Sequence, residues 1–427
     1  MKLLIKNTKI IPTGGATPIT GSIAIENSTI THVGEVPKDF TPQREIEGRN
    51  LLALPGLVNA HTHSAMGIFR NLADDLSFGD WLFGKIIPAE AKLTEEDVYW
   101  GCLLGIAEMI KSGTTCFADM YLHMGSIARA VEEAGIRANL SFGPITSDVR
   151  GGGLVVDAQG CSAFIKEWNG AADGRIKTFM EIHSVYLFDK PSITDAALLA
   201  KELGVGTHIH LSESITELER SREMYGLTPI QAAHKMGVLD SNVLAAHCVQ
   251  LDDEDIELLR VNGVNPVHCP SSNLKLGNGF APAGRMLREG INLCLGTDGS
   301  ASNNNLNMLE EMHLAALIHK GVSKDPLCVP ASQVIDMATT NGALAAGFKD
   351  VGKIATGYKA DIILIDTNKP HLCPVHDVKS AVVYAMQAAD VDTVIINGQV
   401  VMQNRQLVGL DEELIMAKVR EIAKRVC

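Results

Sequence analysis

The sequence predicts an α/β fold: a (β/α)8 barrel of the TIM type with a small β domain built from both chain ends. From Leu57 to about Leu344, strand-like apolar runs alternate with helix-length segments. Eight such units in succession are typical of a TIM barrel, whose parallel strands are covered on both faces and therefore read as continuous apolar runs. The two ends of the chain are different, because short strands dominate them.

Each segment has its own pattern. Residues 1–54 contain the short strands MKLLIKNTKIIP, SIAIENSTITHVGE and NLLALPG, separated by turns. The barrel, over residues 55–350, is predicted from LPGLVNAHTH, TTCFADM, ANLSFGPI, KTFMEIHSVY, GTHIHLSE, NVLAAHCV, GVNPVHCP and INLCLGTDG. Thr94 and Asp97 predict a helix start before VYWGCLLGIAEMIKSG, and Gly113 predicts its end. Residues 351–427 return to strands and finish with a helix, so both ends can contribute to one accessory sheet.

Composition and charge favour a globular protein with a small-molecule partner. Apolar residues make up 46% of the 427 residues, and charged residues 20%. The net charge of −13 argues against nucleic acid, whose partners usually present Lys and Arg. No signal peptide is apparent, and no apolar run approaches the roughly 20 residues that span a bilayer. The nine cysteines lack CxxC pairs and are predicted to be reduced thiols, so we expect a cytoplasmic protein.

Histidines and an aspartate recur where predicted barrel strands end. His61 and His63 are two residues apart on the first strand, so both side chains point to the same side and can bind one ion. The alternative is a pair of ordinary packed or surface histidines. Further candidates follow on strands five, six and eight: His210, His247 and Asp298. Because barrel enzymes place catalytic groups at the carboxyl ends of strands, the sequence predicts a metal site there.

The same pattern suggests a division of chemical work. A zinc-like ion held by three imidazoles and a carboxylate can lower the pKa of a bound water to about 7. Glu213, just past strand five, can donate a proton to a ring nitrogen, and Asp298 can act as both ligand and base. His247 would orient the nucleophile or stabilise its charge. His208 and His268 are predicted to support the site rather than bind the ion.

Taken together, NAHTH, HxHxxE, AAHC and GTDG resemble the amidohydrolase superfamily across the whole chain. Within it, WLFGKIIPAEAKLTEEDVYWG, HIHLSESITE, PVHCPSSNLKLGNGFAP and LGTDGSASNNNLNMLEEM resemble the 5′-methylthioadenosine/S-adenosylhomocysteine deaminases. The resemblance implies a TIM barrel with a β-sandwich from both chain ends, and hydrolytic deamination of adenosine-type nucleosides. It also implies a single metal ion. Binuclear relatives carry a bridging Lys at the end of strand four. In this chain the predicted strand four, KTFMEIHSVY, has one Lys, Lys177, and it lies at the start of the strand.

The resemblance also assigns substrate contacts. It implies that Glu90 binds the ribose hydroxyls and that His183 contacts the nucleoside. Arg150, in a Gly-rich loop, would pair with the carboxylate of S-adenosylhomocysteine, or else be a solvated loop arginine. Trp81 would form an apolar wall over the substrate, although from the sequence alone it could equally belong to a helix core.

Other interpretations share the same metal ligands. Guanine deaminases, cytosine deaminases, triazine hydrolases and imidazolonepropionases use such a site, and Glu90 is the feature that favours a nucleoside. A non-enzymatic scaffold of this shape is the other alternative. The ion is expected to be zinc, with iron or manganese possible, and a homodimer or homotetramer is expected from the resemblance.

Overall fold

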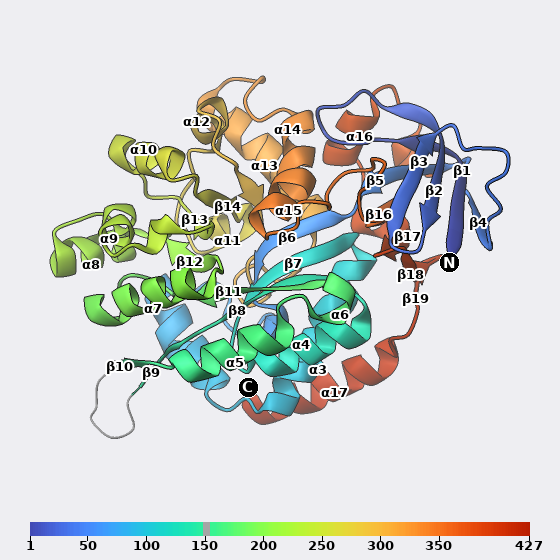
Figure 1. The fold of residues 1–427 in the computed structure, drawn as a ribbon. Coiled ribbons are helices and arrows are strands. Elements are labelled where there is room, and N and C mark those ends of the chain that lie inside the picture. Colours follow the sequence, from blue (N-terminus) through green and yellow to red (C-terminus); the bar gives the residue numbers. More distant parts are fainter. Residues whose placement is uncertain (148–153) are drawn as a thin grey trace.

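Two large sheets organise the chain in this computed structural model, which describes residues 1–147 and 154–427 (Figure 1). The first is an eight-stranded sheet in which every paired strand is parallel. Its order along the sheet is β15-β14-β13-β12-β11-β8-β7-β6. These strands are β6 (Leu57–Thr62), β7 (Thr114–Met120), β8 (Arg137–Phe142), β11 (Ile176–Glu181), β12 (Thr207–Leu211), β13 (Val243–His247), β14 (Asn265–His268) and β15 (Cys294–Leu295).

The sheet closes into a barrel where its first and last strands meet. The amide of Asp298, just after β15, donates a hydrogen bond to the carbonyl of His61 on β6 at 3.0 Å. A small apolar cluster fills the interior, with Phe179 on β11 among its members. The (β/α)8 prediction is therefore confirmed, and each of the eight predicted strand segments overlaps a barrel strand.

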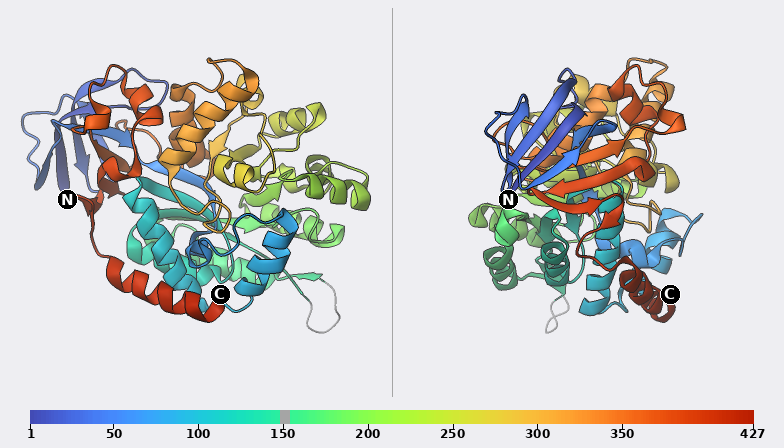
Figure 2. Two further views of the ribbon diagram at one scale, coloured as in Figure 1. Left: turned by 180° about the vertical axis from the view of Figure 1, so that it is seen from behind. Right: turned by 90° about the vertical axis from the view of Figure 1, so that its right-hand side faces the viewer.

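Helices surround the barrel (Figures 1 and 2). They include α3 (Glu95–Lys111), α4 (Met124–Ala134), α5 (Ala158–Trp168), α7 (Lys190–Leu203), α8 (Ile215–Tyr225), α9 (Pro229–Lys235), α10 (Asp253–Val261), α11 (Pro270–Lys275), α12 (Ala283–Arg288), α13 (Met308–Ser323) and α14 (Ala331–Asp336). The sequence explains the ends of α3: Thr94 and Asp97 form the predicted capping box, and Gly113, two residues past the helix, takes a left-handed φ of 93°.

Two smaller features lie near the barrel mouth. Between β6 and α3 the chain forms α1 (Phe78–Trp81), a π-helical turn (Leu82–Ile86) and α2 (Ile87–Glu90), so Trp81 and Glu90 lie on one short helical segment. After β8, a hairpin pairs β9 (Ile145–Ser147) with β10 (Leu154–Val156). The segment that contains Arg150 lies outside the described residues.

The second large sheet is mixed and lies beside the barrel (Figure 2). Its nine strands come from both chain ends: β1 (Lys2–Ile10), β2 (Ile19–Glu26), β3 (Thr29–Gly34), β4 (Arg44–Glu47), β5 (Leu51–Pro55), β16 (Ile362–Asp366), β17 (Val391–Ile396), β18 (Gln399–Gln403) and β19 (Gln406–Leu407). The antiparallel pairing of β5 with β16 joins the two ends, and residues of both ends share one apolar core. The accessory domain from both ends is thus confirmed, whereas boundaries at residues 54 and 350 stay a prediction.

A bidentate ion pair links this sheet to the barrel. Arg137 on β8 donates through Nε to Asp361 Oδ2 at 2.7 Å and through Nη2 to Asp361 Oδ1 at 3.0 Å. Both side chains are almost fully buried, at 2% and 0% exposure. The C-terminal helix α17 (Glu412–Val426) packs along α3 (Figure 2). A shorter helix, α16 (Val378–Tyr384), lies between β16 and β17 in the sequence.

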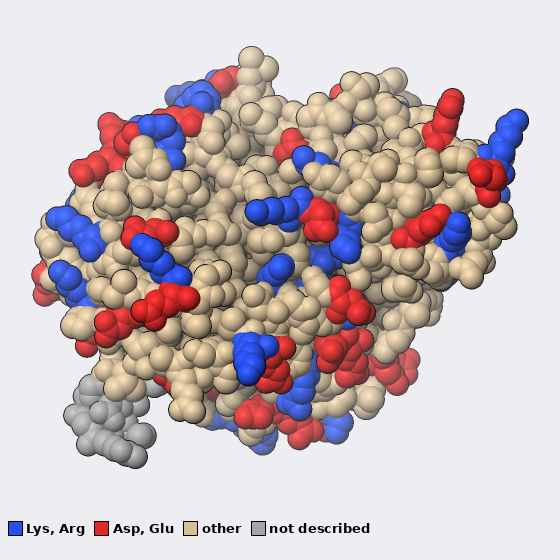
Figure 3. Space-filling view, in the orientation of Figure 1, with Lys and Arg blue, Asp and Glu red and all other residues tan. Residues whose placement is uncertain are grey.

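Charged side chains of both signs are mixed on one face of the surface (Figure 3), and the cysteines are not paired. On the face drawn in Figure 3, Lys and Arg side chains are interspersed with Asp and Glu. All nine cysteines are free thiols, and seven are buried. Within the described residues, no helix is both long and apolar enough to cross a membrane.

Candidate metal centre and active site

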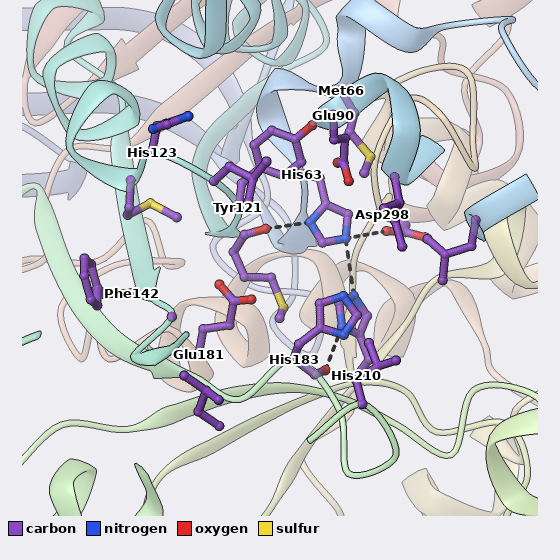
Figure 4. A pocket seen from close by; sticks show the side chains of 18 of the residues that line it. His63, Met66, Glu90, Tyr121, His123, Phe142, Glu181, His183, His210 and Asp298 are labelled. Carbon is purple, nitrogen blue, oxygen red and sulfur yellow. Dashed lines mark hydrogen bonds and ion pairs between the residues drawn. The ribbon is translucent and has the colours of Figure 1, made fainter. Parts of the chain in front are cut away.

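Four of the predicted metal ligands meet at the carboxyl end of the barrel. His61, His63, His210 and Asp298 each offer one ligand atom, and these atoms all lie within 4.8 Å of one another. Asp298 Oδ1 is 3.4 Å from His61 Nε2 and 3.2 Å from His63 Nε2, and His210 Nε2 is 3.3 Å from His63 Nε2. His61 is on β6 and His63 directly follows it, His210 is on β12, and Asp298 follows β15. Figure 4 shows His63, His210 and Asp298.

The hydrogen bonds of these histidines suit a cation. His63 Nδ1 donates to the carbonyl of Met120 at 2.6 Å, and His210 Nδ1 donates to the carbonyl of His183 at 2.9 Å. A carbonyl only accepts, so each Nδ1 carries the proton and each Nε2 presents a lone pair. His61 Nε2 is buried and has no hydrogen-bond partner among the described residues. An ion at this point would satisfy all three Nε2 atoms at once.

His61 is oriented from below by a second histidine. Its Nδ1 lies 2.9 Å from His208 Nε2, and His208 Nδ1 lies 3.1 Å from Ser141 Oγ. A proton on His61 Nδ1 makes His208 Nε2 the acceptor and leaves His208 Nδ1 to donate to the serine. His208 is thus one layer deeper than the metal group, as predicted. His268 is also outside that group, with its Nε2 2.9 Å from His319 Nε2.

The carboxylate of Asp298 is held on both oxygens. Oδ1 accepts from the Gly299 amide at 2.8 Å, while Oδ2 accepts from Ser272 Oγ at 2.7 Å and Ser302 Oγ at 2.6 Å. Asp298 and His247 both adopt left-handed backbone, with φ of 61° and 74°. Such conformations cost a non-glycine residue about 1–3 kcal/mol and concentrate at functional sites, so these two positions are maintained against strain.

Glu213 and His247 form the adjoining part of the site. Their closest atoms, Glu213 Oε2 and His247 Nε2, are 3.8 Å apart. Asn278 donates to Glu213 Oε1 at 2.9 Å, and His247 Nδ1 lies 3.0 Å from Asn273 Oδ1. Burial raises the pKa of Glu213 above its ordinary value, although the charge of His247 opposes the shift. A carboxyl in this environment is suited to deliver a proton.

These groups face a cavity of about 1030 Å³. All of the predicted substrate residues within the described chain line it, namely Trp81, Glu90, His183, Glu213 and Asp298. Figure 4 shows Glu90, His183 and Asp298 among them. His61 lies beneath it, fully buried. A cavity of this size is at the upper end of small-molecule sites and exceeds what one purine requires.

Three of the cavity residues have distinct environments. The Trp81 ring is buried and its Nε1 donates to the Ala301 carbonyl at 3.2 Å. The His183 ring lies 4.5 Å from the His210 ring, centre to centre, and is tilted by 38° to it, and burial lowers the pKa of His183 to about 4. The buried His183 Nδ1 has no hydrogen-bond partner in the described chain. Burial also raises the pKa of Glu90, an effect that the nearby Tyr121 hydroxyl reduces.

Several supporting residues escaped the sequence prediction. The PSSNLKLGN segment, which enters the sequence prediction only as part of a motif, supplies Ser272, Asn273 and Asn278 as hydrogen-bond partners of Asp298, His247 and Glu213. Glu217 on α8 accepts from the backbone amides of Ser212 at 3.0 Å and Glu213 at 2.6 Å. Polar residues around the ligands could have been suspected, but which of them turn inward depends on loop geometry that spacing does not give.

The comparisons with known proteins agree with this geometry. Residues 52–401 match the amidohydrolase family. The chain belongs to the amidohydrolase family. This amidohydrolase is 54% identical to a 5-methylthioadenosine/S-adenosylhomocysteine deaminase of Acetivibrio thermocellus, with all of both chains covered. It is 49% identical to a protein of the same name from Pelotomaculum thermopropionicum, over 95% of this chain and 94% of that one.

Two solved structures that contain zinc are similar to this amidohydrolase. An adenosine deaminase from Xanthomonas campestris with bound zinc superposes with a TM-score of 0.93 at 32% identity, covering 99% of this chain and 98% of that one. An atrazine chlorohydrolase from Arthrobacter aurescens, complexed with zinc, gives 0.91 at 25% identity, over 99% and 100%. With its His and Asp group, this amidohydrolase is a metal-dependent hydrolase that holds a divalent ion.

Proposed function

We propose that this amidohydrolase deaminates adenosine-type nucleosides, converting 5′-methylthioadenosine and S-adenosylhomocysteine to inosine-type products and ammonia. The observation that carries the proposal is the presence of Glu90 in the same cavity as the metal group and Glu213. A carboxylate can accept two hydrogen bonds from a ribose diol, which a free base or a triazine lacks. The names of the relatives at 54% and 49% identity support the same substrate class.

In this proposal His61, His63, His210 and Asp298 hold one zinc ion. Nitrogen and oxygen donors of this kind suit zinc, and both structural neighbours named above contain it. When bound, the ion supplies a Lewis acid that lowers the pKa of water at the site to about 7. The protein's own residues supply the positioning and the proton transfers.

Glu213 acts first as an acid. Burial raises its pKa, which favours the protonated form, and Asn278 holds one oxygen while the other faces the substrate. Donation to purine N1 makes C6 more electrophilic. His247, with Nδ1 held by Asn273, presents Nε2 toward the attacking water and stabilises charge there. Water adds to C6 while Asp298 takes one of its protons and passes it to the amino group, which leaves as ammonia when the C6–N bond breaks. The remaining hydroxyl proton returns to Glu213 as the C6 carbonyl forms.

The remaining residues hold the nucleoside. Glu90 binds the ribose hydroxyls, the unpartnered His183 Nδ1 contacts the base, and Trp81 covers the substrate from the short helical segment. Arg150 would pair with the amino-acid carboxylate of S-adenosylhomocysteine, and it lies outside the described residues. In the alternative reactions, guanine deamination and triazine dechlorination, the substrate has no ribose diol for Glu90 to bind.

The test is an assay of ammonia release from adenosine, 5′-methylthioadenosine, 5′-deoxyadenosine and S-adenosylhomocysteine, with guanine and cytosine as alternative substrates. We expect the nucleosides to react and the bases to remain. Glu213→Gln should retain about one equivalent of metal by elemental analysis and lose turnover. Chelation should abolish activity, and added zinc should restore it. Turnover of a free base alone would refute the role of Glu90, and full activity of Glu213→Gln would refute its role as acid.

A further inference from the structure

A carboxylate that the proposed mechanism does not use faces the substrate cavity. Glu181 is the last residue of β11, and side chains alternate along a strand, so it points the same way as Phe179 of the barrel interior and as His183. Figure 4 shows it inside the cavity between Phe142 and His183. The position is thus at the barrel mouth, beside the nucleoside contacts and not among the metal ligands.

The backbone leaves room for this carboxylate. Gly143 follows β8, the strand that pairs with β11, and a Cβ added there would lie 3.3 Å from Glu181 Oε2. A side chain at Gly143 would therefore crowd the carboxylate. Glu181 makes no side-chain hydrogen bond or ion pair with any described residue, so its oxygens are free for a ligand. Burial raises its pKa to about 8, which a cation beside it would reverse.

The charges and the shape around Glu181 favour a cationic ligand on an apolar stem. Six carboxylates line the cavity, namely Glu90, Glu95, Glu167, Glu181, Glu213 and Asp298. Among the described lining residues, Arg129 is the one Lys or Arg, and it is exposed and donates to Ser126. Beside Glu181, the stacked rings of Phe142 and Phe164, 5.2 Å apart, form an apolar wall.

We propose that Glu181 binds an ammonium group carried by the 5′ substituent of the nucleoside. The inference rests on the proposed function and deepens it. With the purine at the metal group and the ribose at Glu90, the part of the cavity walled by Phe142 and Phe164 is left for the 5′ chain. A thioether chain packs on the two rings, and the ammonium at its end donates to the carboxylate. Glu181 thereby selects 5′-aminoalkylthio nucleosides, a class that includes S-adenosylhomocysteine.

The experiment compares two substrates of equal length, 5′-(3-aminopropylthio)-5′-deoxyadenosine and the neutral 5′-propylthio-5′-deoxyadenosine. Neither carries a carboxylate, so Arg150 does not enter the comparison. Glu181→Gln keeps the shape and one acceptor oxygen but removes the charge. We expect kcat/KM for the amino substrate to fall about 10- to 100-fold, with the neutral substrate within about threefold of wild type. Glu202→Gln, which neutralises an exposed carboxylate on α7 outside the cavity lining, is the matched control and should change neither.

Different failures separate the two proposals. Equal losses for both substrates in Glu181→Gln, or no loss for either, would overturn the role of Glu181 while leaving nucleoside deamination intact. A wild-type enzyme that releases ammonia from neither substrate nor from 5′-methylthioadenosine would overturn the proposed function itself. Glu181→Met, an apolar replacement of similar length, repeats the comparison if Glu181→Gln does not fold, and it must show the same selective loss.

Discussion

Replacing Glu217 with Gln tests how the acid Glu213 is positioned. The two carboxylate oxygens of Glu217 accept one backbone amide each, from Ser212 and Glu213, at the turn where Ser212 has a left-handed φ of 54°. The side chain is 2% exposed, so water cannot replace it. The Gln side chain offers only one acceptor oxygen, and its amino group would face the second amide, donor against donor. One buried N–H is then left without a partner.

The free-energy cost of this unpaired N–H sets the expected effect of Glu217→Gln on catalysis. A buried unsatisfied donor costs about 1–3 kcal/mol. If the turn relieves this by moving Glu213, the barrier rises by a similar amount, and kcat/KM for 5′-methylthioadenosine falls about 5- to 150-fold. Steady-state ammonia release measures this, alongside elemental analysis, which should show unchanged metal content. Glu219→Gln, an exposed carboxylate on the same helix, is the control. Wild-type kcat/KM in Glu217→Gln would refute the positioning role.

Three other changes probe separate parts of the molecule. Glu90→Gln should raise KM for 5′-methylthioadenosine about tenfold or more but hardly affect a 2′,3′-dideoxy analogue, and equal effects on both in steady-state assays would contradict diol binding. Arg137→Met leaves Asp361 buried and unpaired, so we expect a loss of about 3–5 kcal/mol and of about 3–6 °C in Tm by calorimetry, with partial recovery in the Arg137→Met/Asp361→Leu double variant. Arg425 lowers the pKa of Asp97 despite its burial, so docking of α17 is stabilised above about pH 4 and weakened as pH falls through the lowered pKa. Hydrogen exchange of α17 should report this, and Arg425→Ala should remove the pH step.

Barrel and metal group could be predicted because both depend on regular structure. Parallel strands are read from continuous apolar runs, and their carboxyl ends meet at one rim whatever the loops do. His61, His63, His210 and Asp298 follow from strand position alone, and the structure brings them within 4.8 Å. The accessory domain could be predicted only as strands at both ends. In the structure β5 lies between β1 and β16. Its pairing with β16 depends on contacts between residues more than 300 positions apart.

The supporting residues could not be found in the same way. Glu217 is on a helix that otherwise carries exposed charges, so its sequence position suggests a solvated side chain, yet it is buried beneath Glu213. Asn273 and Asn278 reach the site because a six-residue helix, α11, and the turn after it bring them there. Trp81 and Glu90 were assigned from the resemblance, since no periodicity indicates that the segment between β6 and α3 returns over the barrel mouth.

The residues that select the substrate must lie around the barrel mouth, where side-chain positions are harder to predict than the barrel itself. The overall structure is shared with an adenosine deaminase and an atrazine chlorohydrolase at TM-scores of 0.93 and 0.91, and both were solved with zinc. A metal that activates water does not distinguish an amino group from a chloride as the leaving group, so discrimination has to come from groups that touch the rest of the substrate. In this chain we propose that those groups are Glu90, for the ribose diol, and Glu181 beside the apolar wall, both of which line the cavity. Exchanging these two carboxylates for Gln should therefore alter which nucleosides react while leaving the bound metal in place.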